Sequence, residues 1–185
     1  MTIKIITKEQ EEKLLKTPGN IRWNLIYSLM LHAGLRVGEV VQLTRADFFN
    51  DGRINARLLI RAEITKTKTS RIVPLVPYTI ATLKKYAEGF TYTERENLFS
   101  FLLPSYVDGH HVSIRHIQRM LEMHSIKAFG QKINPHMLRH TYATRLIKVT
   151  NIRVVQVLLG HKSIQSTQIY THPDITDLDK AVDLI

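Results

Sequence analysis

Apolar residues recur at helical spacing over most of the chain, between polar residues that favour helix ends. Thr7 and Gln10 have the spacing of a capping box, so a short helix is predicted to begin there. Asn20 can cap a second helix that ends near Gly34. The apolar positions of this second helix fall on one face: Ile21, Leu25, Ile26, Leu29 and Met30. The stretch "RVGEVVQL" that follows predicts another short helix.

The pattern changes in "FFNDGRINARLLIRAEITKTKTSRIVPL", which begins at Phe48. Asp51-Gly52 is a turn signal, and runs rich in β-forming residues flank a polar loop, "TKTKTS". We expect a small antiparallel sheet with this loop at a hairpin tip.

Helical spacing returns after Pro77, which can occupy the first turn of a helix. Ser113 can cap a further helix, Asn134 followed by proline can start another, and Asn151 can cap one that ends at Gly160. The chain has no repeats, low-complexity tract or linker. We therefore predict one α+β domain that is mostly helical with a small antiparallel sheet.

Composition excludes several kinds of protein. The chain has 185 residues, of which 44% are hydrophobic, so one well-buried core is available. It has no cysteine, which excludes disulfides, thiolate zinc sites and cysteine nucleophiles and favours a reducing, cytoplasmic interior. No apolar run approaches the roughly 20 residues that a membrane helix needs. The N-terminus lacks the apolar core of a signal peptide.

Charge indicates a polyanionic partner. Lys and Arg total 26 against 16 acidic residues, a net charge of +10. The excess is concentrated in residues 51–72 and 110–148, whereas residues 173–185 carry four Asp and one Lys. A basic surface of this kind most often binds nucleic acid, although it is also found on soluble proteins with no such partner.

Several cationic and titratable side chains lie at the predicted ends of elements, and their types suit attack on a phosphodiester. A tyrosine such as Tyr170, with a pKa near 10, is ionised only about one part in a thousand at neutral pH and needs a nearby proton acceptor. Arginine forks and a histidine N–H can hold the charge that gathers on the non-bridging oxygens. A hairpin lysine can protonate the leaving alkoxide. Taken alone, an arginine at a helix start, a hairpin lysine or a tyrosine is more often a surface or packing residue, and His136 with Arg139 could equally be a satisfied polar pair.

A zinc site is the other chemistry that the histidines could support. His136 and His140 have the i, i+4 spacing of a zincin helix. That pattern needs glutamate where this chain has Met137, and no third ligand has a fixed spacing. We expect no metal and no cofactor.

Four segments in order resemble the motifs of the tyrosine recombinases, also called phage integrases. "HAGLRVGEVVQLTRADF" resembles the family's first arginine motif and "ITKTKTSRIVPL" its β-hairpin lysine motif. "NPHMLRHTYATRLI" matches the HxxRH motif, and "VVQVLLGHKSIQSTQIYTH" matches the histidine and tyrosine motif. The resemblance covers nearly the whole chain, and the last two motifs are the most specific.

The resemblance implies both a fold and a set of functional residues. The fold is that of a recombinase catalytic domain. The implied catalytic residues are Arg36, Lys66, His136, Arg139, His161 and Tyr170. The implied supporting residues are Glu39 and His140, and the expected DNA-binding residues are Lys68, Arg71, Arg115 and Arg119. Lys66 is preferred to Lys68 as the catalytic lysine because it lies five residues before Arg71, the usual offset in the family.

The implied function is site-specific DNA recombination or integration through a 3′-phosphotyrosyl intermediate, without metal or ATP. Two alternatives remain open at this point. A type IB topoisomerase shares the chemistry but rejoins the same strand, and a DNA-binding regulator could keep the fold without cutting.

The family also leads to expectations about organisation and partners. Members usually carry an N-terminal core-binding domain, and we expect residues 1–185 to form a single catalytic domain without it. The expected partner is double-stranded DNA, bound by a homo-tetramer, and no membrane is expected. We expect a cytoplasmic, nucleoid-associated protein that originates from a prokaryote, a phage or a mobile element. The acidic tail, residues 174–185, has an apolar stripe and is expected to dock on the next protomer.

Overall fold

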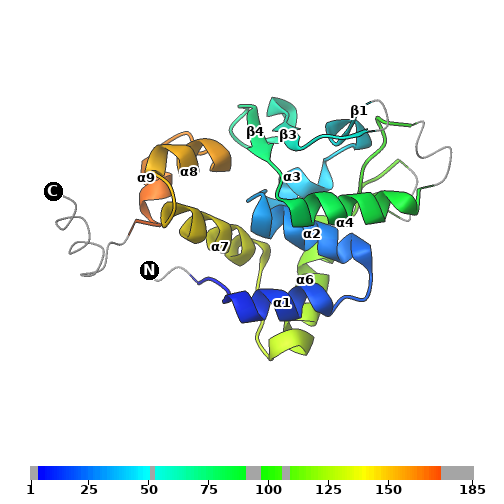
Figure 1. Ribbon diagram of the computed structural model, residues 1–185, viewed down its shortest axis with the longest axis horizontal. Helices are drawn as coiled ribbons and strands as arrows, with labels where there is room; N and C mark the ends of the chain where they lie inside the picture. The colour runs from blue at the N-terminus through cyan, green and yellow to red at the C-terminus, as the bar shows by residue number, and fades with distance from the viewer. Residues whose placement is uncertain (1–3, 51–52, 91–96, 106–108, 172–185) are drawn as a thin grey trace.

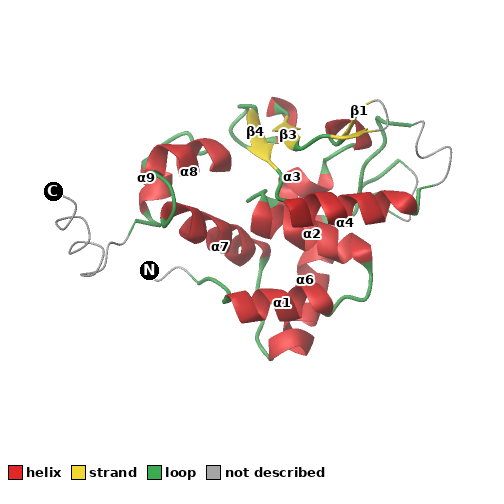
Figure 2. Ribbon diagram, viewed as in Figure 1, coloured by secondary structure: helices red, strands yellow, loops and turns green. Residues whose placement is uncertain are grey.

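The described part of the chain is mostly helical (Figures 1 and 2), and its strands form two short antiparallel hairpins. The computed structural model describes residues 4–50, 53–90, 97–105 and 109–171. Its helices are α1 (Lys8–Lys16), α2 (Ile21–His32), α3 (Val37–Val41), α4 (Pro77–Glu88), α6 (Ile114–Phe129), α7 (Pro135–Ile147), α8 (Ile152–Leu159) and α9 (Gln165–Gln168). Its strands are β1 (Phe49–Asn50), β2 (Arg53–Ile54), β3 (Arg57–Ile60) and β4 (Arg71–Pro74), and it has 3-10 turns at Arg45–Asp47 and Ala62–Ile64. The predicted α+β class is confirmed.

The predicted helix starts are confirmed because each depends on a local side chain. Thr7 and Gln10 form a complete capping box at α1. The side chain of Asn20 accepts a hydrogen bond from the backbone at α2, and those of Ser113 and Asn134 do the same at α6 and α7. Each cap satisfies an N–H group that the helix itself leaves unpaired.

The middle of helix α2 is buried on every side rather than on the single face that the sequence predicted. Leu25 and Leu29 are buried as expected, but Tyr27 and Ser28, on other faces, are buried too. The reason is that α4, α7 and α1 all pack against α2. Polar groups on this helix are paired: the Ser28 hydroxyl bonds that of Thr79 at 2.5 Å, and the Tyr27 hydroxyl lies 2.7 Å from His124 Nδ1.

The β region forms two separate hairpins instead of one sheet. Strands β1 and β2 pair with each other, and the Asp51-Gly52 turn predicted between them lies outside the described residues. Strands β3 and β4 pair from Arg57 with Pro74 to Ile60 with Arg71, which leaves "TKTKTS" in the connecting loop as predicted. Burial alternates along β4, with Arg71 and Val73 inward and the residues between and after them outward.

A second, smaller core lies beside the main one. Helix α7 runs from the main body to α8 and α9, and the β3–β4 hairpin lies close to α8 (Figure 1). The buried residues of this second core are Ala143, Val155, Leu159 and Tyr170. The candidate site therefore lies where α3, β4 and α7 meet the α8–α9 unit. The tail prediction, residues 174–185, lies outside the described residues. Among the described residues, no helix is both long and apolar enough to span a bilayer.

Candidate active site

A buried carboxylate, Glu39, lies at the centre of the site. Glu39 is on α3 and is only 1% exposed. Arg71 on β4 donates two parallel hydrogen bonds to it, Nη1 to Oε1 at 2.9 Å and Nη2 to Oε2 at 2.7 Å. Arg36, the residue before α3, adds a backbone N–H bond to Oε2 at 2.9 Å and a guanidinium bond to Oε1 at 3.1 Å. Both oxygens are therefore held by charged or backbone donors.

Glu39 stays ionised, but it does not neutralise the site. Burial opposes its ionisation, yet the hydrogen bonds and charge of Arg71 prevail and hold the pKa of Glu39 below its usual range. Arg139 approaches the same carboxylate, with Nη1 4.0 Å from Oε2. Three guanidinium groups thus face one carboxylate, so the cluster keeps a net positive charge suited to an anion.

Arg139 is anchored by backbone carbonyls on both sides of the site. Its Nη1 donates to Gly34 O at 2.5 Å and its Nη2 to Leu159 O at 2.7 Å, while Arg36 Nη1 lies 3.4 Å from the same Leu159 oxygen. Burial, together with the nearby charge of Arg36, lowers the pKa of Arg139 to about 9. Arg139 therefore remains charged at neutral pH, and its position is defined before any ligand arrives.

Two glycines with left-handed backbone allow close packing of side chains at the site. Gly34 has φ +63°, and a Cβ added there would lie 2.3 Å from Cδ1 of Tyr142. Gly160 also has φ +63°, and its added Cβ would lie 3.0 Å from Cδ of Arg71. Gly160 ends α8, so the last helical carbonyls, which carry partial negative charge, face the arginines. One of them, Leu158 O, accepts from Arg71 Nε at 2.9 Å.

His161 follows this turn and is neutral. Its Nε2 lies 3.3 Å from Arg139 Nη2, and its Nδ1 lies 2.9 Å from the hydroxyl of Thr167. Because a guanidinium can only donate, Nε2 is the acceptor and Nδ1–H donates to Thr167. Burial and the charges of Arg139 and its neighbouring arginines lower the pKa of His161 to about 4.

Tyr170 lies just after α9, with its ring in the smaller core. It is 7% exposed, and its hydroxyl is 2.7 Å from Nδ1 of His140 on α7. Burial raises the pKa of Tyr170, opposed in part by the charges of Arg139 and Arg36. The phenol is therefore protonated at neutral pH and within electrostatic reach of the arginine cluster.

Among the described residues, the remaining implied catalytic residues, His136 and Lys66, make no hydrogen bond to the cluster. His136 is exposed in the first turn of α7, with its ring 6.3 Å from that of His140. Lys66 is exposed on the β3–β4 loop and makes no hydrogen bond to another described residue. Lys68 has φ +54°, and its ammonium group donates to the carbonyl of Glu63 on its own hairpin at 3.2 Å.

The expected DNA-binding residues occupy different environments. Arg115 and Arg119 are exposed one turn apart on α6, a helix whose first residue, Ile114, lies close to Gly38 of α3. Arg71, by contrast, is 7% exposed with its guanidinium bound to Glu39 and Leu158. In the free protein Arg71 therefore supports Glu39. Arg71 and Val73 are two residues apart on β4, so their side chains face the same, buried side of the strand. This alternation is the signal in the sequence that could have indicated the role of Arg71.

Thr167 and the direct contact of His140 with Tyr170 were not anticipated. Both depend on how α9 folds back on α7 and α8, and no spacing in the sequence indicates such a contact. Among the described residues, no cluster of His, Asp and Glu is arranged to hold a metal ion.

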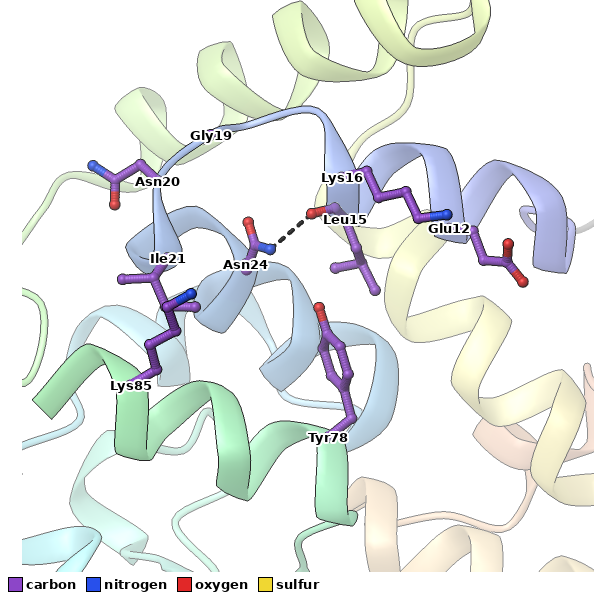
Figure 3. Close-up of a pocket in the computed structure, with 9 residues that line it drawn as sticks. All are labelled: Glu12, Leu15, Lys16, Gly19, Asn20, Ile21, Asn24, Tyr78 and Lys85. Atoms are coloured by element: carbon purple, nitrogen blue, oxygen red, sulfur yellow. Dashed lines mark hydrogen bonds between the residues drawn. The ribbon is translucent and has the colours of Figure 1, made fainter. Parts of the chain in front are cut away.

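A separate hollow, with a volume of about 750 Å³, lies between α1, α2 and α4. Figure 3 shows the residues that line it. Tyr78, Leu15 and Ile21 contribute apolar surface, and Lys16 and Lys85 contribute ammonium groups. It shares no residue with the arginine cluster, and its chemistry does not resemble that of the candidate site.

Comparison with known proteins agrees with this fold. The model of the Phage integrase family matches residues 4–176. The tyrosine recombinase XerC of Thermodesulfovibrio yellowstonii is 33% identical over 192 residues, covering 97% of this chain and 61% of the relative. The chain therefore spans about three-fifths of that relative's length.

Two solved structures have the same fold. A XerA recombinase superposes with a TM-score of 0.74 at 25% identity, over 97% of this chain and 64% of the other. A XerH site-specific recombinase bound to difH substrate, in a pre-cleavage complex, superposes with a TM-score of 0.71 at 27% identity. The superposition covers 100% of this chain and 56% of the other. From the matched motifs, the fold and these relatives, the chain belongs to the phage integrase family.

Proposed function

We propose that this chain is the catalytic domain of a site-specific tyrosine recombinase, which cleaves and rejoins DNA through a 3′-phosphotyrosyl intermediate. The observation that carries the proposal is the arginine cluster around Glu39, which is net positive and lies within electrostatic reach of the Tyr170 phenol. Such a cluster can bind a phosphodiester, and the Tyr170 hydroxyl, which contacts His140 next to Arg139 on α7, is the proposed nucleophile. The relatives named above support the same activity.

The proposed step is a transesterification. The Tyr170 oxygen attacks the scissile phosphorus, the bond to the 5′-oxygen breaks, and Lys66 gives that oxygen a proton. Arg36 and Arg139 stabilise the charge on the non-bridging oxygens through their planar forks. A 5′-hydroxyl from the partner duplex then reverses the step, so the phosphotyrosine conserves the bond energy.

His161 has to change its hydrogen bonding to take part. In the free protein Nε2 accepts from Arg139, so this atom cannot donate to a phosphate oxygen. A bound phosphate competes for the Arg139 guanidinium, and its negative charge favours a proton on Nε2. Thr167 keeps the ring oriented throughout, through Nδ1. We assign His136, exposed at the start of α7, to acid/base work at the phosphate.

Lys66 is the better candidate for the proton donor of the leaving group. The ammonium of Lys68 is folded back onto Glu63, whereas Lys66 makes no hydrogen bond within the described part of the chain. Lys68, Arg115 and Arg119 are exposed and are assigned to the DNA backbone, where Lys and Arg neutralise phosphates.

We further propose that four protomers assemble on two duplexes through the tail, residues 174–185. The tail carries four Asp and one Lys. The lining of the hollow in Figure 3 holds apolar side chains, the ammonium groups of Lys16 and Lys85 and one carboxylate, Glu12, so its charge is net positive and complements the acidic tail. Deletion of the tail, or Lys16→Glu with Lys85→Glu, should weaken cooperative assembly on a two-site DNA without changing the melting temperature of the monomer. A large melting loss with normal cooperativity would mean that the tail packs on its own domain.

The activity is tested on duplexes carrying the binding site, selected from random-sequence DNA and nicked near the cleavage position. The nick lets the cleaved fragment diffuse away, so an enzyme is trapped covalently. The wild type should be trapped and should exchange strands between two duplexes. Binding without trapping would indicate a non-cutting regulator, and relaxation of supercoils without exchange would indicate a topoisomerase.

A further inference from the structure

The hydroxyl of Tyr170 has a histidine partner other than the one at the start of the HxxRH motif. His140 lies one turn after His136 on α7, and its Nδ1 is 2.7 Å from the Tyr170 oxygen. The two rings lie 5.6 Å apart, whereas the rings of His136 and His140 are 6.3 Å apart. His136 is exposed, while His140 is partly buried against the smaller core. Of these two histidines, only His140 is in direct hydrogen-bond contact with the phenol.

The protonation states define the direction of this hydrogen bond. Burial, followed by the charges of His136 and Arg139, lowers the pKa of His140, so its ring is neutral at neutral pH. Burial keeps Tyr170 protonated. A neutral imidazole with a free Nδ1 can accept, and the phenol can donate, so the bond runs from Tyr170 O–H to His140 Nδ1.

We propose that His140 accepts the proton of Tyr170 as the phenol oxygen attacks the scissile phosphate, an inference that rests on the proposed function. In that step the O–H bond of Tyr170 breaks, its proton passes to Nδ1, and the O–P bond forms. The P–O5′ bond breaks in turn, and the leaving oxygen takes its proton from Lys66. In rejoining, His140 returns the proton to Tyr170.

Bound phosphate controls when this transfer occurs. In the free protein, positive charge around His140 opposes its protonation, so premature ionisation of Tyr170 is disfavoured. The charged or titratable groups that interact with His140 are His136 and Arg139 on α7, His161 after α8, and Tyr170 after α9. A phosphate held by Arg36 and Arg139 offsets this positive charge and makes His140 a better acceptor. The site then becomes reactive only when DNA occupies it.

The test separates proton acceptance from mere positioning. In His140→Asn the side-chain amide places a hydrogen-bonding group near the position of Nδ1, so Tyr170 can stay in place without a base. Single-turnover trapping on the nicked duplex should slow by roughly 10²–10⁴-fold, the usual contribution of general base catalysis. DNA affinity and melting temperature should match those of the wild type. His136→Asn serves as the comparison on the same helix.

Fluorinated tyrosine incorporated at position 170 gives the decisive readout, because its phenol is more acidic and needs a base less. It should restore much of the rate in His140→Asn and little in His136→Asn. In the otherwise wild-type protein it should shift the pH–rate profile to lower pH, a measurement that needs no His140 variant to fold.

Three outcomes would overturn the assignment in different ways. Trapping of His140→Asn at the wild-type rate would remove His140 from the chemistry. A slow His140→Asn with no recovery from the fluorinated residue would leave it only a positioning role. Failure of the wild type itself to be trapped would remove the proposed function, and this inference with it.

Discussion

Replacing Glu39 by glutamine tests whether one buried carboxylate holds the arginine cluster together. Glu39 is 1% exposed and bonds Arg71 at 2.7 Å and 2.9 Å and Arg36 at 3.1 Å. The amide keeps the size of the side chain but removes the charge, so the guanidinium groups lose their counter-ion. Removing one partner from a buried ion pair costs about 3–5 kcal/mol.

This loss is large enough to measure in a domain of this size. At roughly 2–4 °C per kcal/mol, Glu39→Gln should lower the melting temperature by about 6–20 °C. Inorganic phosphate should recover part of the loss, because an anion can replace the missing charge. Glu122→Gln is the matched control, since it breaks an exposed ion pair with Lys132 worth about 0–1 kcal/mol.

The difference in melting temperature between wild type and Glu39→Gln should depend on pH, because the pKa of Glu39 is lowered in the folded protein. A carboxyl group with a lower pKa in the folded state stabilises the protein above its unfolded pKa and loses this contribution as the pH falls through the folded value. Melts of wild type and Glu39→Gln should therefore differ most near neutral pH and converge in acid. A melting loss no larger than that of the Glu122→Gln control, or a difference independent of pH, would refute the reasoning.

Three further predictions concern single residues of the site. Arg139→Lys should slow single-turnover cleavage by about two or more powers of ten, because a point charge does not replace a preorganised fork; near-normal cleavage would mean that Arg139 supplies only bulk charge. Lys66→Ala should be rescued by a substrate whose leaving 5′-oxygen is replaced by sulfur, since a thiolate needs no proton. Rescue of Lys68→Ala instead would mean that Lys68, and not Lys66, is the proton donor. Thr167→Val should slow cleavage while Thr167→Ser retains it, as rates on the same nicked substrate would show; equal rates for both would leave the His161 orientation independent of this hydroxyl.

Features with local causes were predictable from the sequence. The caps at Thr7, Asn20, Ser113 and Asn134 are confirmed because each cap and the N–H it binds lie within three residues. The loop between β3 and β4 also lies at the predicted position, between two runs of residues that favour β-strands.

Features with distant causes were not predictable in the same way. The burial of α2 on all sides depends on α4 and α7, which are far away in sequence. Arg71 was expected at the DNA surface, but the approach of β4 to α3 and α8 buries it against Glu39. The motifs identified His140 and Tyr170, yet not their contact, because it joins α7 to the segment after α9.

In the proposed function, Tyr170 carries the DNA strand during the reaction. The most direct measurement is mass spectrometry of the trapped complex after nuclease and protease digestion. A nucleotide joined through its 3′-phosphate to the oxygen of Tyr170 is the predicted result, and Tyr170→Phe should bind the duplex without forming any adduct. An adduct on another residue, or covalent trapping of the Phe variant, would contradict the account.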